Sequence, residues 1–414
     1  MSDSEEEMNE GSQSRSSGSD GEEQENVRRE PFDVRLPPAH QYLQLAAAEE
    51  TSPGFKMEEA DKVITVSILE MPVVLLPSQL LPFHTDLPML VSQLREAARQ
   101  NDFIAFKPAL PGKNSDIATL IQVRSLQEND GGITVQAIGR QRCRILTRRS
   151  AINGMPYGDV RVLDEREMSD FIYAFYPVSF SRMRLSKAKR FYAALSAHSN
   201  FALHASLTVK RYGYVLTNEN VGESLVDRLV KWLIVFHQLD KVNTVLAQGR
   251  TAFSYWVAAN IPTDMETRLE LLDEPCTDRR LANECAIIKR IDLIVCRGCG
   301  TTLSKMSNMI NVSTEGNSAL YVNPGGYVHD LFTVSEVRST VARGRPSSEY
   351  SWFPGYKWTI HECAYCMQHV GWRFTSSNLT PSSFFGLTRS SIRPADSTRP
   401  SATGVQRIEQ LAII

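Results

Sequence analysis

The sequence predicts a mixed α+β multidomain protein, in which a mostly β domain with a helical insertion precedes a zinc-stapled β-sheet domain. Three observations support this fold class. Residues 62–146 show the alternating apolar pattern of strands, and residues 165–290 change to a helical period. Beyond residue 290 the chain carries two Cys-x-x-Cys motifs among Gly, Pro and aromatic residues, which is typical of a metal-stabilised β fold.

Composition excludes several classes of protein. The chain of 414 residues is 42% hydrophobic and has a formal net charge of -2, so it can bury ordinary cores but has no overall basic field. Nucleic acid is therefore not expected as the main partner. The sequence does not open with a signal-peptide pattern, and no apolar run approaches the ~18 residues of a membrane span. We expect a nuclear and cytoplasmic protein with no membrane span.

Both ends of the chain are expected to be poorly ordered. Residues 1–38 are rich in Ser, Glu, Asp and Gly, with few large apolar side chains. Because such a segment cannot bury enough surface to offset its ordering entropy, we predict a disordered acidic tail. Residues 396–414 are predicted to form a C-terminal tail.

The first folded region, residues 62–290, begins with strands. Alternating apolar runs predict three of them, at residues 63–69, 118–126 and 133–146. The turn-forming residues Asn129-Asp-Gly-Gly132 join the last two strands. Prolines at Pro72 and Pro77 mark strand ends or turns, because proline cannot donate a ladder hydrogen bond.

One helix is predicted among these strands. Apolar residues recur at helical spacing from Leu87 to Ala97. Thr85 or Asp86 is the expected N-cap, and Pro88 falls in the first turn, where proline is tolerated. This part of the chain is therefore predicted to be a small, mostly β fold with one helix.

The region from 165 to 290 is predicted to be helical. One apolar stripe includes Leu225, Leu229 and Leu233, and Trp232 and Phe236 extend it. A second stripe holds Leu281, Cys285 and Ile288, on the helix that leads to the first Cys-x-x-Cys motif. We interpret Trp232 as a core residue and Cys285 as a buried structural thiol.

The two cysteine motifs are Cys296-Arg-Gly-Cys299 and Cys363-Ala-Tyr-Cys366. Each turn can aim two sulfurs at one point, and together they complete a tetrahedral shell for one structural Zn²⁺. The 63-residue spacer between the motifs must then form a β subdomain. A redox role is less favoured, because neither motif lies at the strand-to-helix junction of a thioredoxin-like unit. Four thiolates also leave no open position for a catalytic water.

Three tryptophans, Trp352, Trp358 and Trp372, surround the second motif beside Pro and Gly. Core packing is the simplest interpretation of such rings. Rings placed next to chain breaks on a metal-stapled scaffold can instead be held apart as the walls of a cage. A cage of this kind suits a cation or a flat neutral ring, and polar main-chain groups at its mouth would decide between them.

Over residues 62–395 the chain resembles the cereblon family, whose members are substrate receptors of cullin-RING ubiquitin ligases. The motifs that carry the resemblance are Tyr321-Val-Asn-Pro-Gly-Gly-Tyr-Val-His329, Gly344-Arg-Pro-Ser-Ser-Glu-Tyr-Ser-Trp-Phe-Pro-Gly-Tyr356, Gly371-Trp-Arg-Phe374 and Phe385-Gly-Leu-Thr-Arg389. The resemblance implies that residues 291–395 form a zinc- and cyclic-imide-binding (CULT) domain. Its cage would take thalidomide-type glutarimides and the C-terminal cyclic imides of damaged proteins.

The resemblance also implies the roles of individual residues. The implied ligand-binding residues are Asn323 near the mouth, Tyr350 at the rim, Trp352, Trp358 and Trp372 as walls, and Phe374 as the floor. The implied zinc ligands are Cys296, Cys299, Cys363 and Cys366. Backbone groups around Tyr350 and Trp352 would pair with the imide N–H and a carbonyl. Vertebrate members of the family carry His at the position of Tyr350, so a phenol replaces any imidazole contact here.

The first folded region resembles the N-terminal substrate-binding domain of Lon proteases. The stretches Leu69-Glu-Met-Pro-Val-Val-Leu-Leu-Pro77 and Ala137-Ile-Gly-Arg-Gln-Arg142 carry this resemblance. No G-x-x-x-x-G-K-[ST] phosphate loop occurs in the sequence, so we expect a scaffold and not an enzyme. In the family, the helical insertion, here about 165–260, docks on the damaged-DNA-binding-protein adaptor that leads to the cullin.

The predicted function is that of a non-catalytic receptor. It would bring substrate proteins, bearing C-terminal cyclic imides or recruited by imide ligands, to a partner ligase for ubiquitination and proteasomal degradation. An ATP-independent Lon-like peptide-binding or protease-related protein is the first alternative, but a protease needs a Ser-Lys pair in a further domain, for which the assigned regions leave no room. The second alternative is a zinc-ribbon nucleic-acid module, which needs a basic face around the cysteines.

Overall fold

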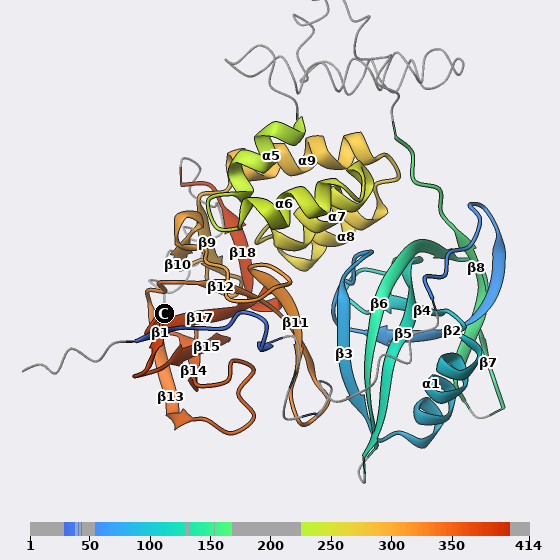
Figure 1. The fold of residues 1–414 in the computed structure, drawn as a ribbon, viewed down its shortest axis with the longest axis horizontal. Coiled ribbons are helices and arrows are strands. Elements are labelled where there is room, and N and C mark those ends of the chain that lie inside the picture. Colours follow the sequence, from blue (N-terminus) through green and yellow to red (C-terminus); the bar gives the residue numbers. More distant parts are fainter. Residues whose placement is uncertain are drawn as a thin grey trace, which may run out of the picture.

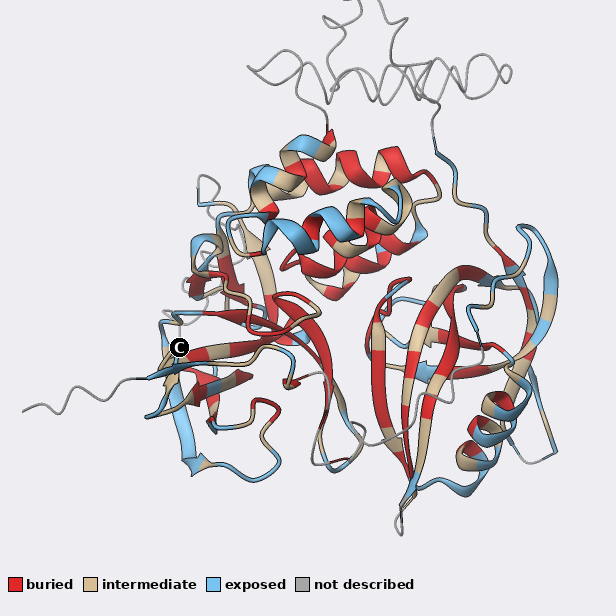
Figure 2. Cartoon of the chain, in the orientation of Figure 1, coloured by how far each residue is buried: buried red, intermediate tan, exposed pale blue. Residues whose placement is uncertain are grey.

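The computed structural model describes residues 29–37, 40, 43, 54–129, 132–152, 154–167 and 225–397. These residues form a β domain, a group of helices and a C-terminal β domain, which Figure 1 shows packed around a common centre. The predicted fold class, mixed α+β with two β domains, is confirmed. Buried residues line the inner faces of all three parts (Figure 2).

The first β domain is a seven-stranded sheet that curls on itself. Its strands are β2 (Val63–Met71), β3 (Leu80–Thr85), β4 (Ile104–Pro108), β5 (Ile117–Asn129), β6 (Gly132–Ile145), β7 (Arg149–Ser150) and β8 (Pro156–Val162). The order is β3-β6-β5-β4-β2-β8-β7, and an additional pairing of β6 with β8 closes the curl. Asn129 lies opposite Gly132 at the β5–β6 turn, as predicted. Strands β3, β4 and β8 were not predicted from the sequence.

The predicted helix is α1 (Pro88–Gln100), which packs on the outside of the sheet. The prediction of Thr85 or Asp86 as its N-cap is wrong. Leu87 occupies the cap position and makes no side-chain cap hydrogen bond. Because Pro88 already has the helical φ and needs no N–H acceptor, it starts the helix without a polar cap, and Thr85 ends strand β3 instead.

The helical region contains α5 (Leu225–Leu233), α6 (Leu239–Leu246), α7 (Arg250–Asn260), α8 (Met265–Asp273) and α9 (Thr277–Arg290). Both predicted stripes face its interior, and Cys285 is buried there. Trp232 is partly buried and packs against both this core and the C-terminal core. The rest of the predicted insertion, residues 168–224, lies outside the described residues.

The C-terminal domain is built on a six-stranded antiparallel sheet in the order β11-β12-β17-β15-β14-β13. Its strands are β11 (Ser318–Val322), β12 (Val328–Val334), β13 (Thr340–Ser347), β14 (Lys357–Cys363), β15 (His369–Thr375) and β17 (Ser383–Thr388). A three-stranded sheet of β9 (Leu293–Cys296), β10 (Thr302–Lys305) and β18 (Ile392–Ala395) lies beside it. Strands β10 to β13 lie between the cysteine motifs, as the long spacer predicts.

The structure differs from the expected tail at residues 29–37. Strand β1 (Glu30–Pro31) pairs in parallel with β16 (Leu379–Thr380) of the C-terminal domain. Phe32 then packs edge-on against Tyr356, with ring centroids 5.2 Å apart. An aromatic anchor and a short ladder therefore hold this segment, although its composition is polar. Residues 1–28 and 398–414, the remainder of both predicted tails, lie outside the described residues.

A buried ionic cluster joins the helices to the C-terminal domain. Asp330 of β12 accepts from the Nε of Arg389 at 3.0 Å and lies 3.1 Å from the Nη1 of Arg268 in α8. Arg389 also donates to the main-chain oxygens of Ala259 and Ile261 at the end of α7. All three charged side chains are buried. Because each buried charge needs the opposite charge for compensation, the cluster stabilises the contact between the helices and the C-terminal domain.

Candidate zinc centre and aromatic cage

The four predicted cysteines converge on one point. Cys296 ends β9 and Cys363 ends β14, and a tight turn after each strand brings the second cysteine of the motif alongside. All four sulfurs lie within 4.8 Å of one another, with the Cys296–Cys366 and Cys299–Cys363 pairs 3.5 Å apart. A tetrahedron with Zn–S bonds of about 2.3 Å has edges of about 3.8 Å, so the cluster fits a single zinc ion.

The sulfurs of the cluster differ in how readily they ionise. Burial opposes ionisation of Cys299, but hydrogen bonds from the side chain and backbone of Thr301 and from Cys363 and Cys366 outweigh it, and the pKa of Cys299 falls to about 6. Burial raises the pKa of Cys296 to about 12. Burial also raises the pKa of Cys363, so a bound cation would be needed to hold Cys296 and Cys363 as thiolates. The cluster is the site of one structural zinc, as predicted.

Three nearby polar residues that could have served as ligands lie outside this cluster. His361 contacts the Thr340 hydroxyl through Nδ1 at 3.0 Å. Glu362 accepts from Arg343 at 2.6 Å, and His369 packs edge-on against Trp372 at 4.6 Å. With four thiolates complete, the shell keeps no open position for water, and the metal stabilises the fold without performing chemistry.

The three tryptophans and Phe374 line one cavity of about 290 Å³. Its lining residues are Asn323, Pro324, Glu349, Tyr350, Trp352, Trp358, Ile360, Trp372 and Phe374. All six residues implied to bind ligand are thus brought together. Trp352 and Trp372 stand nearly perpendicular, at 81° with centroids 4.9 Å apart, and Phe374 is buried beneath them. Trp352 and Phe374 belong to the aromatic core of this domain, and together with Trp358 and Trp372 they also present surface to the cavity.

Main-chain carbonyls fix two of the walls. Trp352 donates its indole N–H to the oxygen of Val322 at 2.8 Å, and Trp358 donates to the oxygen of Glu349 at the same distance. Because these polar edges are already bonded to the protein, the walls offer their flat faces to a ligand. Polar recognition must then come from other groups at the mouth.

Strand pairing sets the remaining side of the cage. Trp358 lies opposite Phe374 in the β14–β15 ladder, and Ile360 lies opposite Trp372. Residues opposite each other on an antiparallel pair point to the same face, so all four side chains project into the cage. The cage is therefore a property of the sheet, and the zinc cluster fixes the end of that sheet at Cys363.

Asn323 and Tyr350 lie at the mouth of the cavity. Asn323 accepts the N–H of Tyr327 through its side-chain oxygen at 2.9 Å, so that oxygen shapes the β11–β12 hairpin. Tyr350 adopts a left-handed backbone with φ of 51° and is 58% exposed. A left-handed residue turns its main chain sharply. This turn carries the backbone from Glu349 to Trp352 around the rim.

Sequence reasoning missed His329, which packs against two of the cage walls without lining the cavity. His329 of β12 packs 5.6 Å from Trp352 and 5.0 Å from Trp372. Burial is the main reason that the pKa of His329 falls to about 4, and the nearby His369 adds to the effect. The ring is therefore neutral at pH 7. His329 was in the motif that carried the resemblance, but a single histidine in a strand gives no signal for such packing. Pro324, Glu349 and Ile360 line the cavity and were also missed, because no local pattern marks them as lining residues.

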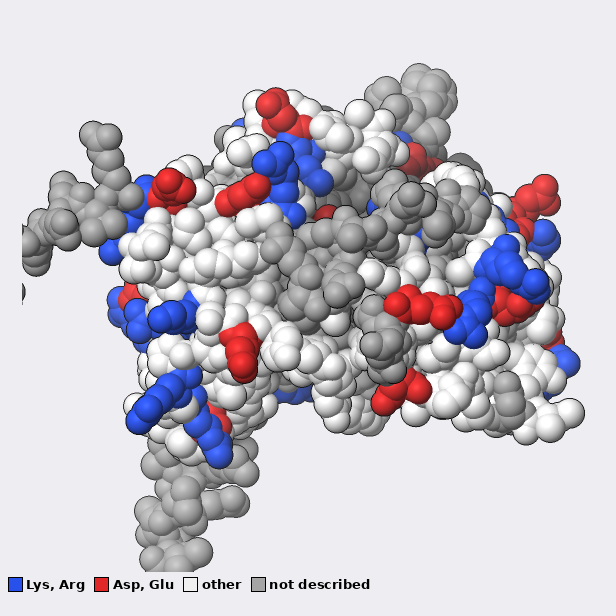
Figure 3. Space-filling view, turned by 60° about the horizontal axis from the view of Figure 1, so that its bottom comes forward, with Lys and Arg blue, Asp and Glu red and all other residues white. Residues whose placement is uncertain are grey.

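Surface charge does not support a nucleic-acid face. On the face drawn in Figure 3, Lys and Arg side chains lie interspersed with Asp and Glu. Near the zinc cluster, Arg297 pairs with Glu266 and Arg343 pairs with Glu362. Mixed charges of this kind produce no extended positive stripe for a phosphate backbone.

Two family models match the chain. Residues 65–290 match the ATP-dependent protease La (LON) substrate-binding domain, and residues 293–404 match the Yippee zinc-binding/DNA-binding and Mis18 centromere assembly family. The chain is 32% identical to protein cereblon of Gallus gallus over 91% of this chain and 87% of the relative. It is 30% identical to protein cereblon of Danio rerio over 91% of this chain and 90% of the relative.

Among solved structures, the Lon N-terminal domain protein from Xanthomonas campestris matches with a TM-score of 0.34 and 16% identity. That match covers 54% of this chain and 98% of the other. Separately, none of the helices in the described part of the chain has the length and apolar character needed to cross a membrane.

Proposed function

Because the chain belongs to the cereblon family, we propose that it is the substrate-recognition subunit of a cullin-RING E3 ubiquitin ligase complex. In this role the cage binds cyclic-imide degrons, either thalidomide-type glutarimides or C-terminal cyclic imides on proteins. The bound substrate is then ubiquitinated by the partner ligase and degraded by the proteasome. We place this activity in the nucleus and cytoplasm.

One observation carries the proposal, namely the convergence of the implied ligand residues on a single aromatic cavity. At about 290 Å³ the cavity is near the lower end of the range for small-ligand sites, ~300–1,000 Å³. Indole faces on several sides suit a flat ring. The indole N–H groups of Trp352 and Trp358 already have acceptors, so the main chain around Tyr350 is left to pair with the imide.

The composition of the cavity supports binding without catalysis. Among the described residues, its lining includes two side chains that can ionise, Glu349 and Tyr350, and no Ser, Thr, Cys, His or Lys. The zinc shell is complete with four thiolates, so it offers no position for an activated water. The protein therefore selects substrates, and the chemistry belongs to its partner.

Adaptor docking is assigned to the helical region, about 165–260. Most of that region lies outside the described residues, but the corner between α5 and α6 is described. It exposes three apolar side chains, Ile234, Val235 and Leu239, of which Val235 is 77% exposed. Neighbouring exposed apolar groups of this kind mark protein-binding surfaces. They support a contact with the damaged-DNA-binding-protein adaptor.

A Lon-like peptide-binding protein is the second candidate, and the match of residues 65–290 to the LON substrate-binding domain favours it. The two candidates place the ligand on different domains. Peptide binding by the first β domain would not respond to changes in the cage.

The test is a pair of variants in the full chain, assayed on an immobilised glutarimide. Trp358→Ala removes one wall, and Tyr365→Ala removes an exposed aromatic ring of the same domain that does not line the cavity. Loss of a central aromatic contact costs at least about 2 kcal/mol, or roughly thirtyfold in affinity. We expect that loss for Trp358→Ala alone, with adaptor co-purification retained by both variants. Equal imide binding by Trp358→Ala and the unmodified chain would refute the cage assignment.

A further inference from the structure

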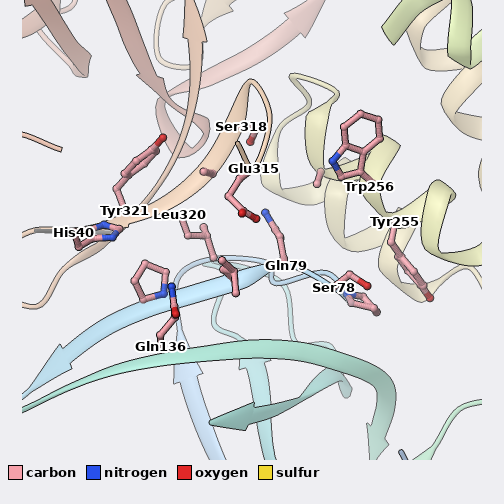
Figure 4. Close-up of a pocket in the computed structure, with 15 residues that line it drawn as sticks. His40, Ser78, Gln79, Gln136, Tyr255, Trp256, Glu315, Ser318, Leu320 and Tyr321 are labelled. Carbon is pink, nitrogen blue, oxygen red and sulfur yellow. The ribbon is translucent and has the colours of Figure 1, made fainter. Parts of the chain in front are cut away.

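His40, from the amino-terminal part of the chain, contacts residues that support the cage. His40 is buried, and its ring lies 5.8 Å from that of Tyr321. Figure 4 shows the two rings side by side at one end of the cavity between the first β domain and the C-terminal domain. Tyr321 in turn lies 5.4 Å from Trp352. His40 thus contributes to the support of a cage wall, Trp352, that lies 312 positions later in the sequence.

The contact centres on Val322, the last residue of β11. This strand lies at the edge of its sheet, and the next residue, Asn323, donates its N–H to Tyr327. Because hydrogen-bonded and non-hydrogen-bonded pairs alternate along an antiparallel ladder, the N–H and C=O of Val322 point away from β12. Val322 is fully buried, so both groups require partners from elsewhere.

Two side chains supply those partners. The Nε2 of His40 accepts the N–H of Val322 at 3.3 Å. The oxygen of Val322 accepts the indole N–H of Trp352 at 2.8 Å. For Nε2 to accept, the imidazole must be neutral and carry its proton on Nδ1. A single edge residue therefore connects His40 to the wall of the cage.

We propose that His40 is a positioning residue of the ligand cage. It holds the edge residue Val322 in place, so that the carbonyl of Val322 fixes the orientation of Trp352. This inference rests on the proposed imide-binding function for its effect on affinity. His40 does not belong to the lining of the cage, so it acts through Val322 and not by touching ligand. Leu43 packs on Val322 from the same segment and completes the support.

The orientation of Trp352 matters because it stands nearly perpendicular to Trp372. The two perpendicular rings form one corner of the cavity, so a rotation of Trp352 changes the shape available to a flat ligand. Without the hydrogen bond to His40, the end of β11 loses one of the contacts that hold it, and the carbonyl that accepts the indole N–H can shift. Ligand binding must then reorder the wall, and affinity falls.

Two substitutions separate the hydrogen bond from the shape of the side chain. His40→Phe keeps a ring of similar size but removes the acceptor, whereas His40→Gln keeps an acceptor near the position of Nε2 but removes the ring. Loss of one buried hydrogen bond corresponds to about a tenfold change in affinity. In the full chain we expect glutarimide to bind His40→Phe about tenfold more weakly, and His40→Gln within about threefold of the unmodified protein. Unchanged binding by His40→Phe, or equal weakening by both, would overturn the proposal.

A second measurement is independent of ligand. The chain has five tryptophans, so indole N–H signals can be resolved after ¹⁵N-tryptophan labelling. Without ligand, we expect the Trp352 indole proton to exchange with solvent faster in His40→Phe than in the unmodified chain or in His40→Gln. If the unmodified chain fails to bind glutarimide but this difference appears, the imide function fails and the role of His40 stands. An unchanged exchange rate in His40→Phe would show that His40 does not position Trp352.

Discussion

Substitution of Asp330 by Asn tests whether the buried ionic cluster ties the C-terminal domain to the helices. Asp330 is the carboxylate partner of two fully buried guanidiniums, those of Arg268 and Arg389. Arg389 would keep its main-chain acceptors after the change. Arg268 would keep Gln79, but it would lose the carboxylate 3.1 Å from its Nη1.

The magnitude follows from burial. Burial lowers the pKa of Arg268 to about 9, against the opposing effect of Asp330, so its charged form already depends on that carboxylate. Removing one partner of a buried ion pair typically costs about 3–5 kcal/mol, because a charge is left without compensation. Glu336→Gln is the matched control in the same domain. Its pair with Arg338 is 52% and 73% exposed, and such pairs contribute about 0–1 kcal/mol.

The assay is urea unfolding of the full chain followed by tryptophan fluorescence. Three of the five tryptophans belong to the C-terminal domain, so its transition dominates the signal. We expect Asp330→Asn to lower the free energy of unfolding by about 3–5 kcal/mol and Glu336→Gln by less than about 1 kcal/mol. A difference below about 1 kcal/mol between the two variants would refute the reasoning.

Two further predictions concern the zinc cluster and His329. Cys363→Ser, or treatment with a chelator, should release one zinc per chain and unfold the C-terminal domain. The control Cys143→Ala changes a thiol in the first β domain and should retain the metal. A folded, metal-free Cys363→Ser protein would contradict the structural role. The pKa of His329 is about 4 when folded and ~6.5 when unfolded, so the stability that its neutral form provides is complete above pH ~6.5 and is lost as the pH falls towards 4. Stability measured over this range should therefore fall less steeply in His329→Phe, and identical slopes would count against the buried, neutral ring.

Local patterns predicted much of the fold. Alternation located β2, β5 and β6, and helical spacing located α1 and the stripe of α9, because one face of each element is buried. The zinc ligands were also predictable, since paired cysteines at short spacing have few other uses in a chain with so little cysteine.

The parts that sequence could not predict depend on distant partners. Residues 29–37 have the composition of a tail, yet Phe32 and a two-residue ladder hold them to the C-terminal domain. Arg142 is fully buried because Glu165 lies 2.5 Å from its Nε, on a segment that follows β8. Arginine is rarely buried unless it is paired, and its partner is not apparent from the sequence. The burial of Arg142 and Arg268 therefore could not be expected.

The cage combines both kinds of information. The family resemblance identified its tryptophans, while the ladder of β14 and β15 explains why they face one another. Ile360 joins the lining, and His329 packs against the walls, only through strand pairing, which no local pattern specifies. His40 is the extreme case, because its partner Val322 lies 282 residues later in the sequence.

Titration of the full chain with glutarimide and with N-methylglutarimide, followed by calorimetry and tryptophan fluorescence, tests the central claim most directly. We predict that one glutarimide binds per chain and quenches the tryptophan fluorescence. N-methylation removes the donor that the rim backbone must accept, so it should weaken binding at least about tenfold. Absence of heat and quenching with glutarimide, in folded protein that contains one zinc per chain, would contradict the proposed function.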